Sequence, residues 1–153
     1  MRDNLRHHSL LSLELVEAIA LEIRKIVEDI EVYDSELSGA EVLTTCLLAH
    51  TLGYVYGEPS TVVRGLFDGQ KHTWLTWNGF IIDLTATQFG ANKRCYCSSW
   101  DNRYQAEHSI PIHNFGLFRK DNIRLLEMLD WRTEYDVCLE EAQNVGKKFL
   151  NEY

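Results

Sequence analysis

The segment from residue 72 to residue 85 carries two side chains that can work together as an acid–base pair. It reads His-Thr-Trp-Leu-Thr-Trp, then Asn-Gly, then Phe-Ile-Ile-Asp-Leu-Thr. Asn-Gly favours a two-residue turn because both residues accept positive φ, and the flanking runs are rich in β-branched and aromatic residues. In such a hairpin Trp74 lies opposite Asp83, and Asp83 is the diagonal neighbour of His72 on the same face. We therefore expect the Asp83 carboxylate to orient the His72 imidazole and to stabilise its charged form, as a general base requires.

Two helices are expected before this hairpin. Apolar residues recur at a helical period from Leu10 to Ile30, which predicts a long amphipathic helix. Ser38 and Glu41 have the S-x-x-E spacing of a capping box. The pattern predicts a second helix from about Ser38 to Leu52, ended by Gly53.

The centre of the chain is expected to form an antiparallel sheet. Asp68-Gly69 and Asn78-Gly79 separate three β-rich runs, which predicts a three-stranded meander. Further strands are expected at Arg94–Ser98 and Ser109–His113. From Asp121 a short helix is expected, followed by a final helix over Thr133–Tyr153. Helices at both ends of a central antiparallel sheet define an α+β fold, and the length of 153 residues fits one domain over residues 1–153.

The order of these motifs resembles the transglutaminase-like branch of the papain-like cysteine protease superfamily. The resemblance rests on a capped helix, Val63-Arg64-Gly65, His-x-Trp at 72–74 and Ile-Ile-Asp-Leu-Thr-Ala-Thr-Gln-Phe at 81–89, and it covers residues 38 to 90. It implies N-terminal helices packed on a central antiparallel β-sheet, with a C-terminal helix. By the resemblance His72 is the base, Asp83 orients it, and a cysteine at the start of the second helix is the nucleophile.

This chain has no cysteine at that helix start. A thiol there would meet the positive end of the helix dipole and free backbone N–H groups, which lower its pKa and bind an oxyanion. The resemblance places the nucleophile at Ala40, with Glu41 and Ser38 as alternatives. An alanine is what a deliberate removal of the nucleophile leaves, and a natural loss leaves the same residue. Cys46 lies six residues further along the same helix, on a different side of it, and is expected in the core.

Two further residues are candidates for substrate binding. Trp74 shares the predicted face of His72 and Asp83, where its ring would shield a channel from water. Gln88 follows the Asp83 strand closely and is expected at the same cleft.

These motifs predict a thiol-type hydrolase or acyltransferase that acts on a protein or peptide amide, as a protease, glutamine deamidase or transglutaminase does. The alternative is a catalytically degenerate relative that serves as a binding, inhibitor or immunity-type protein. Neither function needs a cofactor or a metal. Cys95-x-Cys97 with His108 and His113 offers zinc ligands, but only one residue separates the thiols, where structural zinc sites have two to four.

Composition restricts the partners. The net charge of −8 disfavours contact with the phosphates of nucleic acid. The sequence has no run of about 18 apolar residues for a membrane span and no signal-peptide pattern, so a cytoplasmic location is expected. The sequence leaves the oligomeric state open.

Overall fold

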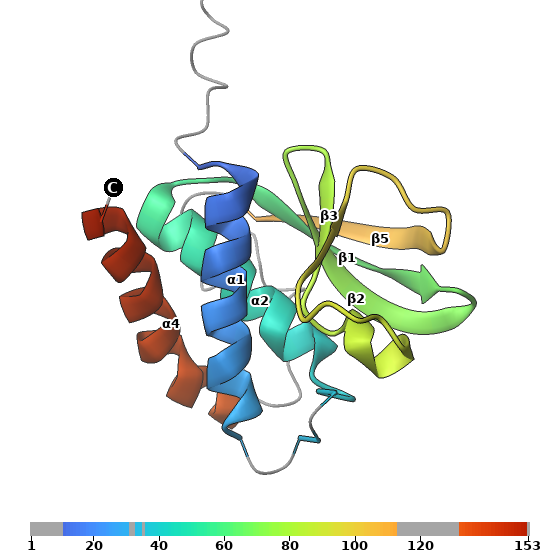
Figure 1. Ribbon diagram of the computed structural model, residues 1–153, viewed down its shortest axis with the longest axis horizontal. Coiled ribbons are helices and arrows are strands. Elements are labelled where there is room, and N and C mark those ends of the chain that lie inside the picture. The colour runs from blue at the N-terminus through green and yellow to red at the C-terminus, as the bar shows by residue number, and fades with distance from the viewer. Residues whose placement is uncertain (1–10, 31–32, 35, 113–131, 153) are drawn as a thin grey trace, which may run out of the picture.

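The computed structural model describes residues 11–30, 33–34, 36–112 and 132–152 (Figure 1). The described chain is an α+β arrangement of helices and one five-stranded antiparallel sheet. The helices are α1 (Leu13–Glu28), α2 (Glu41–Tyr56) and α4 (Arg132–Glu152), with a short 3-10 helix, η2 (Ala86–Phe89). The strands are β1 (Ser60–Phe67), β2 (Gln70–Trp77), β3 (Phe80–Asp83), β4 (Tyr96–Ser98) and β5 (Tyr104–Ile112).

The predicted meander is confirmed. The strand order is β4-β3-β2-β1-β5, and every neighbouring pair is antiparallel. Asp68 and Asn78 have φ of 50°, and the glycines that follow them also have positive φ. Both hairpins therefore use the turn chemistry that the sequence predicts.

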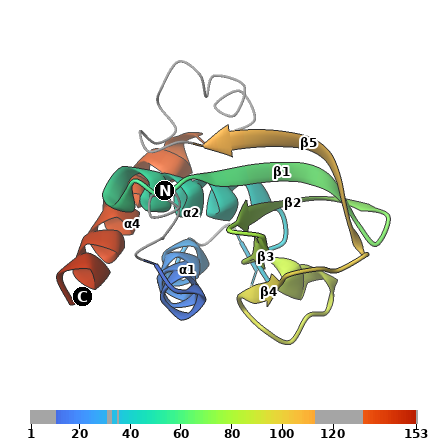
Figure 2. The same cartoon turned by 90° about the horizontal axis from the view of Figure 1, so that it is seen from above.

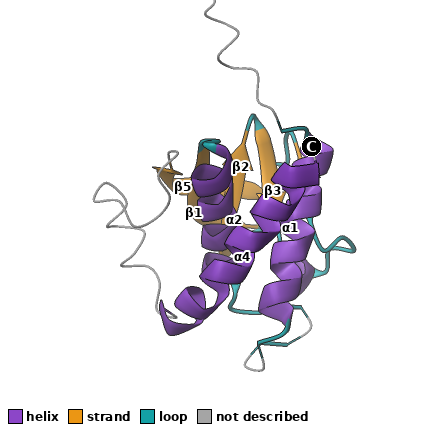
Figure 3. Ribbon diagram, turned by 90° about the vertical axis from the view of Figure 1, so that its left-hand side faces the viewer, coloured by secondary structure: helices purple, strands orange, loops and turns teal. Residues whose placement is uncertain are grey.

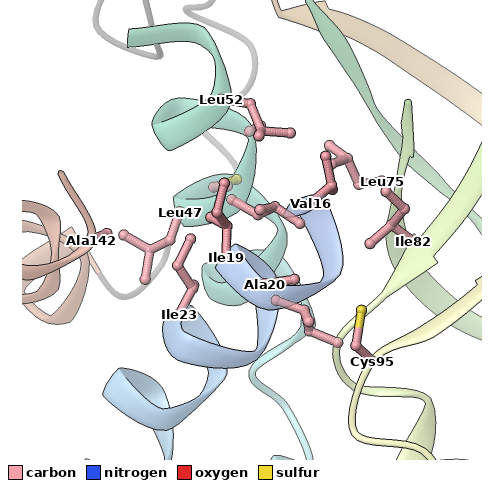
Figure 4. Packing of buried hydrophobic residues seen from close by; sticks show 14 of the residues in the cluster. Val16, Ile19, Ala20, Ile23, Leu47, Leu52, Leu75, Ile82, Cys95 and Ala142 are labelled. Atoms are coloured by element: carbon pink, nitrogen blue, oxygen red, sulfur yellow. The ribbon is translucent and has the colours of Figure 1, made fainter. Parts of the chain in front are cut away.

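The helices α1, α2 and α4 lie on one side of the sheet, as Figures 1 and 3 show. In β2 and β3, Leu75 lies opposite Ile82, and both belong to the apolar core shared with α1 and α2. Figure 4 shows this core around Ile19 of α1 and Leu47 of α2. Because side chains alternate between the faces of a strand, His72 and Trp74 lie on the other face of the sheet.

The predicted capping box is wrong, because α2 begins at Glu41 and its N-cap is Ala40, which makes no side-chain hydrogen bond. Leu37 and Gly39 have positive φ, so the chain turns immediately before α2 and cannot be helical from Ser38. Within that turn the backbone N–H of Ser38 donates to Asp34 Oδ1 at 3.0 Å. A local side-chain acceptor has taken the place of the capping box.

The predicted end of this helix is also wrong. Gly53 is buried inside α2, and the helix continues to Tyr56. Gly57 is the C-cap, with φ of 65°, and its N–H donates to the Gly53 carbonyl at 3.0 Å. Gly57 supplies the left-handed conformation that ends a helix, whereas Gly53 is accommodated as an ordinary helical residue.

The later strands differ from the expectation in length. β4 lies inside the predicted Arg94–Ser98 segment, but β5 begins at Tyr104, five residues before Ser109. β5 is longer because it pairs with the whole of β1, with a bulge beside Arg64 and Gly65.

The final helix is confirmed as α4, whereas the short helix expected from Asp121 lies outside the described residues. In the ranges that the structure describes, no helix combines the length and the apolar character needed to cross a membrane.

Candidate functional site

His72 and Asp83 are in direct contact. His72 Nε2 lies 2.7 Å from Asp83 Oδ2, and the two side chains are only 0% and 1% exposed. The register of the hairpin, with Leu75 opposite Ile82 and Trp77 opposite Phe80, brings them to the same face. The predicted juxtaposition of imidazole and carboxylate is therefore confirmed.

Asp83 accepts two further hydrogen bonds that hold its carboxylate in place. The backbone N–H of Thr85 donates to Oδ1 at 2.9 Å, and the Tyr104 hydroxyl donates to Oδ2 at 2.7 Å. Burial, together with the neighbouring Asp83 carboxylate, raises the pKa of the Tyr104 hydroxyl well above its usual range. Tyr104 therefore stays a hydrogen-bond donor at neutral pH.

No motif in the sequence points to Tyr104 as a site residue. Tyr104 begins β5, which is separated from β3 by two strands in the sheet. Figure 2 shows the start of β5 running from the side of β4 across the end of the sheet, and the rings of Tyr96 and Tyr104 stack at 6.0 Å. This curvature of the sheet, for which the sequence carries no local signal, brings Tyr104 to Asp83.

Aromatic rings enclose the His72 imidazole. The Phe89 ring of η2 stands perpendicular to it at 4.8 Å between centroids, and Phe67 and Tyr104 lie at 6.1 and 6.5 Å. Trp74 is also next to His72, at 6.1 Å, and is itself 2% exposed because it packs on Tyr104. The His–Asp pair therefore lies in an apolar environment, where a hydrogen bond is stronger than in water.

The second nitrogen of the imidazole is buried next to the His–Asp contact. Within the described part of the chain, His72 Nδ1 is buried and has no hydrogen-bond partner. Because Nε2 faces Asp83, Nδ1 is the atom that would exchange a proton with a reacting group.

The 3-10 helix η2 lies between the start of α2 and the His–Asp pair and contacts both. Gln88 Nε2 lies 3.4 Å from Glu41 Oε1, while the next residue, Phe89, contacts the His72 ring. Thr87 Oγ1 also donates to the Glu36 carbonyl at 3.1 Å. The 3-10 helix η2 thus contacts the predicted nucleophile segment on one side and the imidazole on the other.

The three candidate nucleophile positions differ in exposure. Ser38 is exposed, Ala40 is completely buried, and Glu41 is half-buried as the first residue of α2. No hydrogen bond joins any of them to His72 among the described residues. The structure therefore places the helix start beside Gln88, and a catalytic role for these positions stays a prediction.

Cys46 does not fit the role of the nucleophile. It is completely buried in the core cluster, and burial raises the pKa of its thiol well above the usual range. A thiol of this kind stays protonated and unreactive at neutral pH.

Arg24 of α1 forms hydrogen bonds with the chain that follows Asp83. The sequence places Arg24 in a helix but does not predict this role. Its side chain is 2% exposed, and Nη1 donates to the Leu84 carbonyl at 2.8 Å and to Thr87 Oγ1 at 2.9 Å. Nε pairs with Glu28 at 2.8 Å. Arg24 therefore holds Leu84 and Thr87, which lie on either side of Thr85 in the segment that follows Asp83.

Two of the cavities that the described residues form are relevant to the sheet. The smaller, about 200 Å³, is lined by Arg64, Gly65, Lys71, His72, Glu107 and His108. The larger, about 560 Å³, lies at the Asn78-Gly79 turn and is not lined by any of the predicted site residues. Of these two cavities, the smaller adjoins the His–Asp pair through His72.

Comparison of the chain with protein-family models, curated proteins and solved structures gives no significant match.

Proposed function

We propose that this chain is a transglutaminase-like domain that binds a protein or peptide segment at the start of α2 without cleaving it. The proposal rests chiefly on one observation: His72 is buried and bonded to Asp83 through Nε2, while its Nδ1 has no partner among the described residues. This is the acid–base half of a cysteine-type centre. The thiol half is missing, because residues 38 to 41 read Ser-Gly-Ala-Glu.

Hydrolysis or acyl transfer through a thiol needs a nucleophile that this helix start does not supply. Glu41 carries a carboxylate, which is a weak nucleophile and lies against the Gln88 amide. Thiol-dependent cleavage of an amide is therefore expected only of a chain with cysteine at position 40 or 41. Without it, the start of α2 would hold a chain segment, as an inhibitor or immunity-type protein does.

Installing the missing thiol tests whether His72 acts on this position. The variants Ala40→Cys and Glu41→Cys are labelled with iodoacetamide near pH 6.5, and the rate at each cysteine is read by peptide mass spectrometry. Glu14→Cys is the matched control, because Glu14 is exposed and lies in the first turn of another helix, α1, where the helix dipole acts in the same way. At least one of the two site thiols should react about tenfold faster than the control thiol.

Adding His72→Ala to each variant should reduce its rate to that of the control. Rates that are unchanged by His72→Ala in both variants would contradict the proposal. Hydrolysis of a peptide amide or activated ester by the unaltered chain, lost in His72→Ala, would instead show an enzyme that works without the thiol.

Peptide binding is tested with the same variants. A chloroacetamide group attached to a short peptide is compared with chloroacetamide itself at Glu41→Cys and at Glu14→Cys. The proposal predicts that the peptide increases the rate at position 41 and leaves the rate at position 14 unchanged. Equal rate ratios at the two positions would refute binding at the start of α2.

A further inference from the structure

Two thiols and a carboxylate meet between α1 and β4, outside the site described above. Cys95 Sγ and Cys97 Sγ are 3.7 Å apart, and a carboxylate oxygen of Glu17 lies within 4.8 Å of both. Cys95 is 3% exposed, while Glu17 and Cys97 are half-buried. We propose that Glu17, Cys95 and Cys97 form a binding site for one zinc ion.

The spacing of the sulfurs matches a zinc site. Two thiolates bound to a tetrahedral zinc at about 2.3 Å stand about 3.8 Å apart, close to the 3.7 Å between Cys95 and Cys97. Thiolates are soft ligands that select zinc over magnesium or calcium, and a carboxylate oxygen is an accepted third ligand. Glu17 and Cys97 are half-buried, and a water molecule would complete the tetrahedron as the fourth ligand.

The strand register directs the thiols toward α1. Cys97 pairs with Ile82, so the two side chains share the face of the sheet that packs on the helices. Figure 4 shows Cys95 among the core residues contributed by α1 and the sheet.

The backbone that carries the thiols is held against α1 before any metal binds. Glu17 lies seven residues before Arg24, which is two helical turns and the same side of α1. Arg24 Nη1 donates to the Arg94 carbonyl at 3.3 Å, and the Arg94 guanidinium pairs with Glu28 of α1. The residue before Cys95 is thus anchored to α1 twice, and a preorganised set of ligands binds metal more tightly than a mobile one.

Zinc binding requires both thiols to lose their protons. Zinc takes the place of one proton on each thiol, two protons pass to the solvent, and no electron moves. The ion would then link α1 to β4, two segments that are far apart in the sequence.

Cobalt(II) is a direct probe of this site. The full chain, reduced and freed of metal with a chelator, is titrated with Co²⁺ and then with Zn²⁺. We expect one equivalent of Co²⁺ to give the thiolate-to-cobalt charge-transfer absorption and one equivalent of Zn²⁺ to abolish it. Cys97→Ser should abolish the absorption, and Glu17→Gln should weaken zinc binding about tenfold or more, as measured against a chromophoric chelator.

Two matched controls separate these ligands from their neighbours. Glu14→Gln removes an exposed carboxylate one turn before Glu17, and His108→Ala removes an exposed imidazole of β5. Neither should change zinc affinity. His72→Ala should not change it either, so the failure of this proposal and the failure of the proposed function are separate results.

Three results would overturn the proposal: no thiolate charge-transfer absorption with Co²⁺, equal zinc affinity in Cys97→Ser, or equal zinc affinity in Glu17→Gln. A Cys95–Cys97 disulfide in the isolated protein, with no metal uptake after reduction, would indicate a redox pair instead. Should Cys97→Ser fold poorly, the increase in melting temperature caused by Zn²⁺ is compared between the unaltered chain and Glu17→Gln, and an equal increase counts against the site.

Discussion

Asp83 links three parts of the chain through its two carboxylate oxygens. It accepts hydrogen bonds from His72 of β2, from Tyr104 of β5 and from the backbone of Thr85. The contacts with His72 and Thr85 are buried and the contact with Tyr104 is partly buried, so a change at Asp83 leaves donors that water reaches poorly without an acceptor. The effect of a substitution should therefore depend on how many donors it leaves unpaired.

Tyr104→Phe removes one donor and leaves the contact between His72 and Asp83 intact. We expect it to lower the free energy of unfolding by about 1 kcal/mol. Asp83→Asn should cost about 3 kcal/mol, because an amide group cannot accept from every donor and turns its own N–H groups toward some of them. Urea unfolding at pH 7.5 measures both values. Losses for the two variants that are equal and below about 0.5 kcal/mol would show that this network contributes nothing to stability.

At the scale of elements, the close approach of β5 to β1 decides whether Tyr104 reaches the site. Gly65 lies opposite His72 in β2 and beside the bulge where β5 pairs with β1. A Cβ atom at Gly65 would stand 2.1 Å from the Gln105 carbonyl oxygen. Only glycine lets the two strands approach this closely.

Gly65→Ala should therefore push β5 away from β1 and destabilise the protein by about 3 kcal/mol. Gly69→Ala is the control, because Gly69 has a φ of 84° but nothing within 4 Å of an added Cβ. Its cost should be about 1 kcal/mol, from backbone strain alone. Urea midpoints of the two variants test this order. A loss at position 65 no larger than at position 69 would mean that the strands can separate easily.

At the scale of the whole molecule, α2 and α4 are joined through a buried histidine. Gln143 of α4 lies 2.9 Å from His50 of α2, and the His50 ring stacks on Tyr54. Burial lowers the pKa of His50 to about 4. The neutral imidazole can accept from the Gln143 amide, whereas the protonated ring has only donors.

This pKa predicts that acid weakens the packing of the helices. Between pH 6.5 and pH 4 the unfolded chain binds a proton at His50 that the folded chain does not bind, so stability falls as the pH falls through this range. His50→Gln stays neutral and should lack this component. The stability advantage of the unaltered chain over His50→Gln should shrink by up to about 2 kcal/mol between pH 7.5 and pH 5. An advantage that is the same at both pH values in urea unfolding would contradict the prediction.

Short-range patterns predicted much of this fold. The turn residues Asn78-Gly79 and the period of two along a strand were enough to place His72 and Asp83 on one face. The helical period of apolar residues predicted α1 and α4. Both kinds of prediction work because they depend only on residues that are close together in the sequence. The capping box failed because Ser38 and Glu41 match the spacing, while Asp34 and the positive φ of Leu37 and Gly39 make a turn instead.

The sequence by itself therefore determined the His–Asp pair, because both residues lie in one hairpin whose register follows from its turn. It could not place Tyr104 beside Asp83 or Glu17 beside Cys95 and Cys97. The short Cys-x-Cys spacing alone argued against a zinc site. These contacts join segments far apart in the chain, and they depend on the curl of the sheet and on how α1 packs against β4. Only the tertiary structure decided them, because packing of the whole core, and not local propensity, sets such distances.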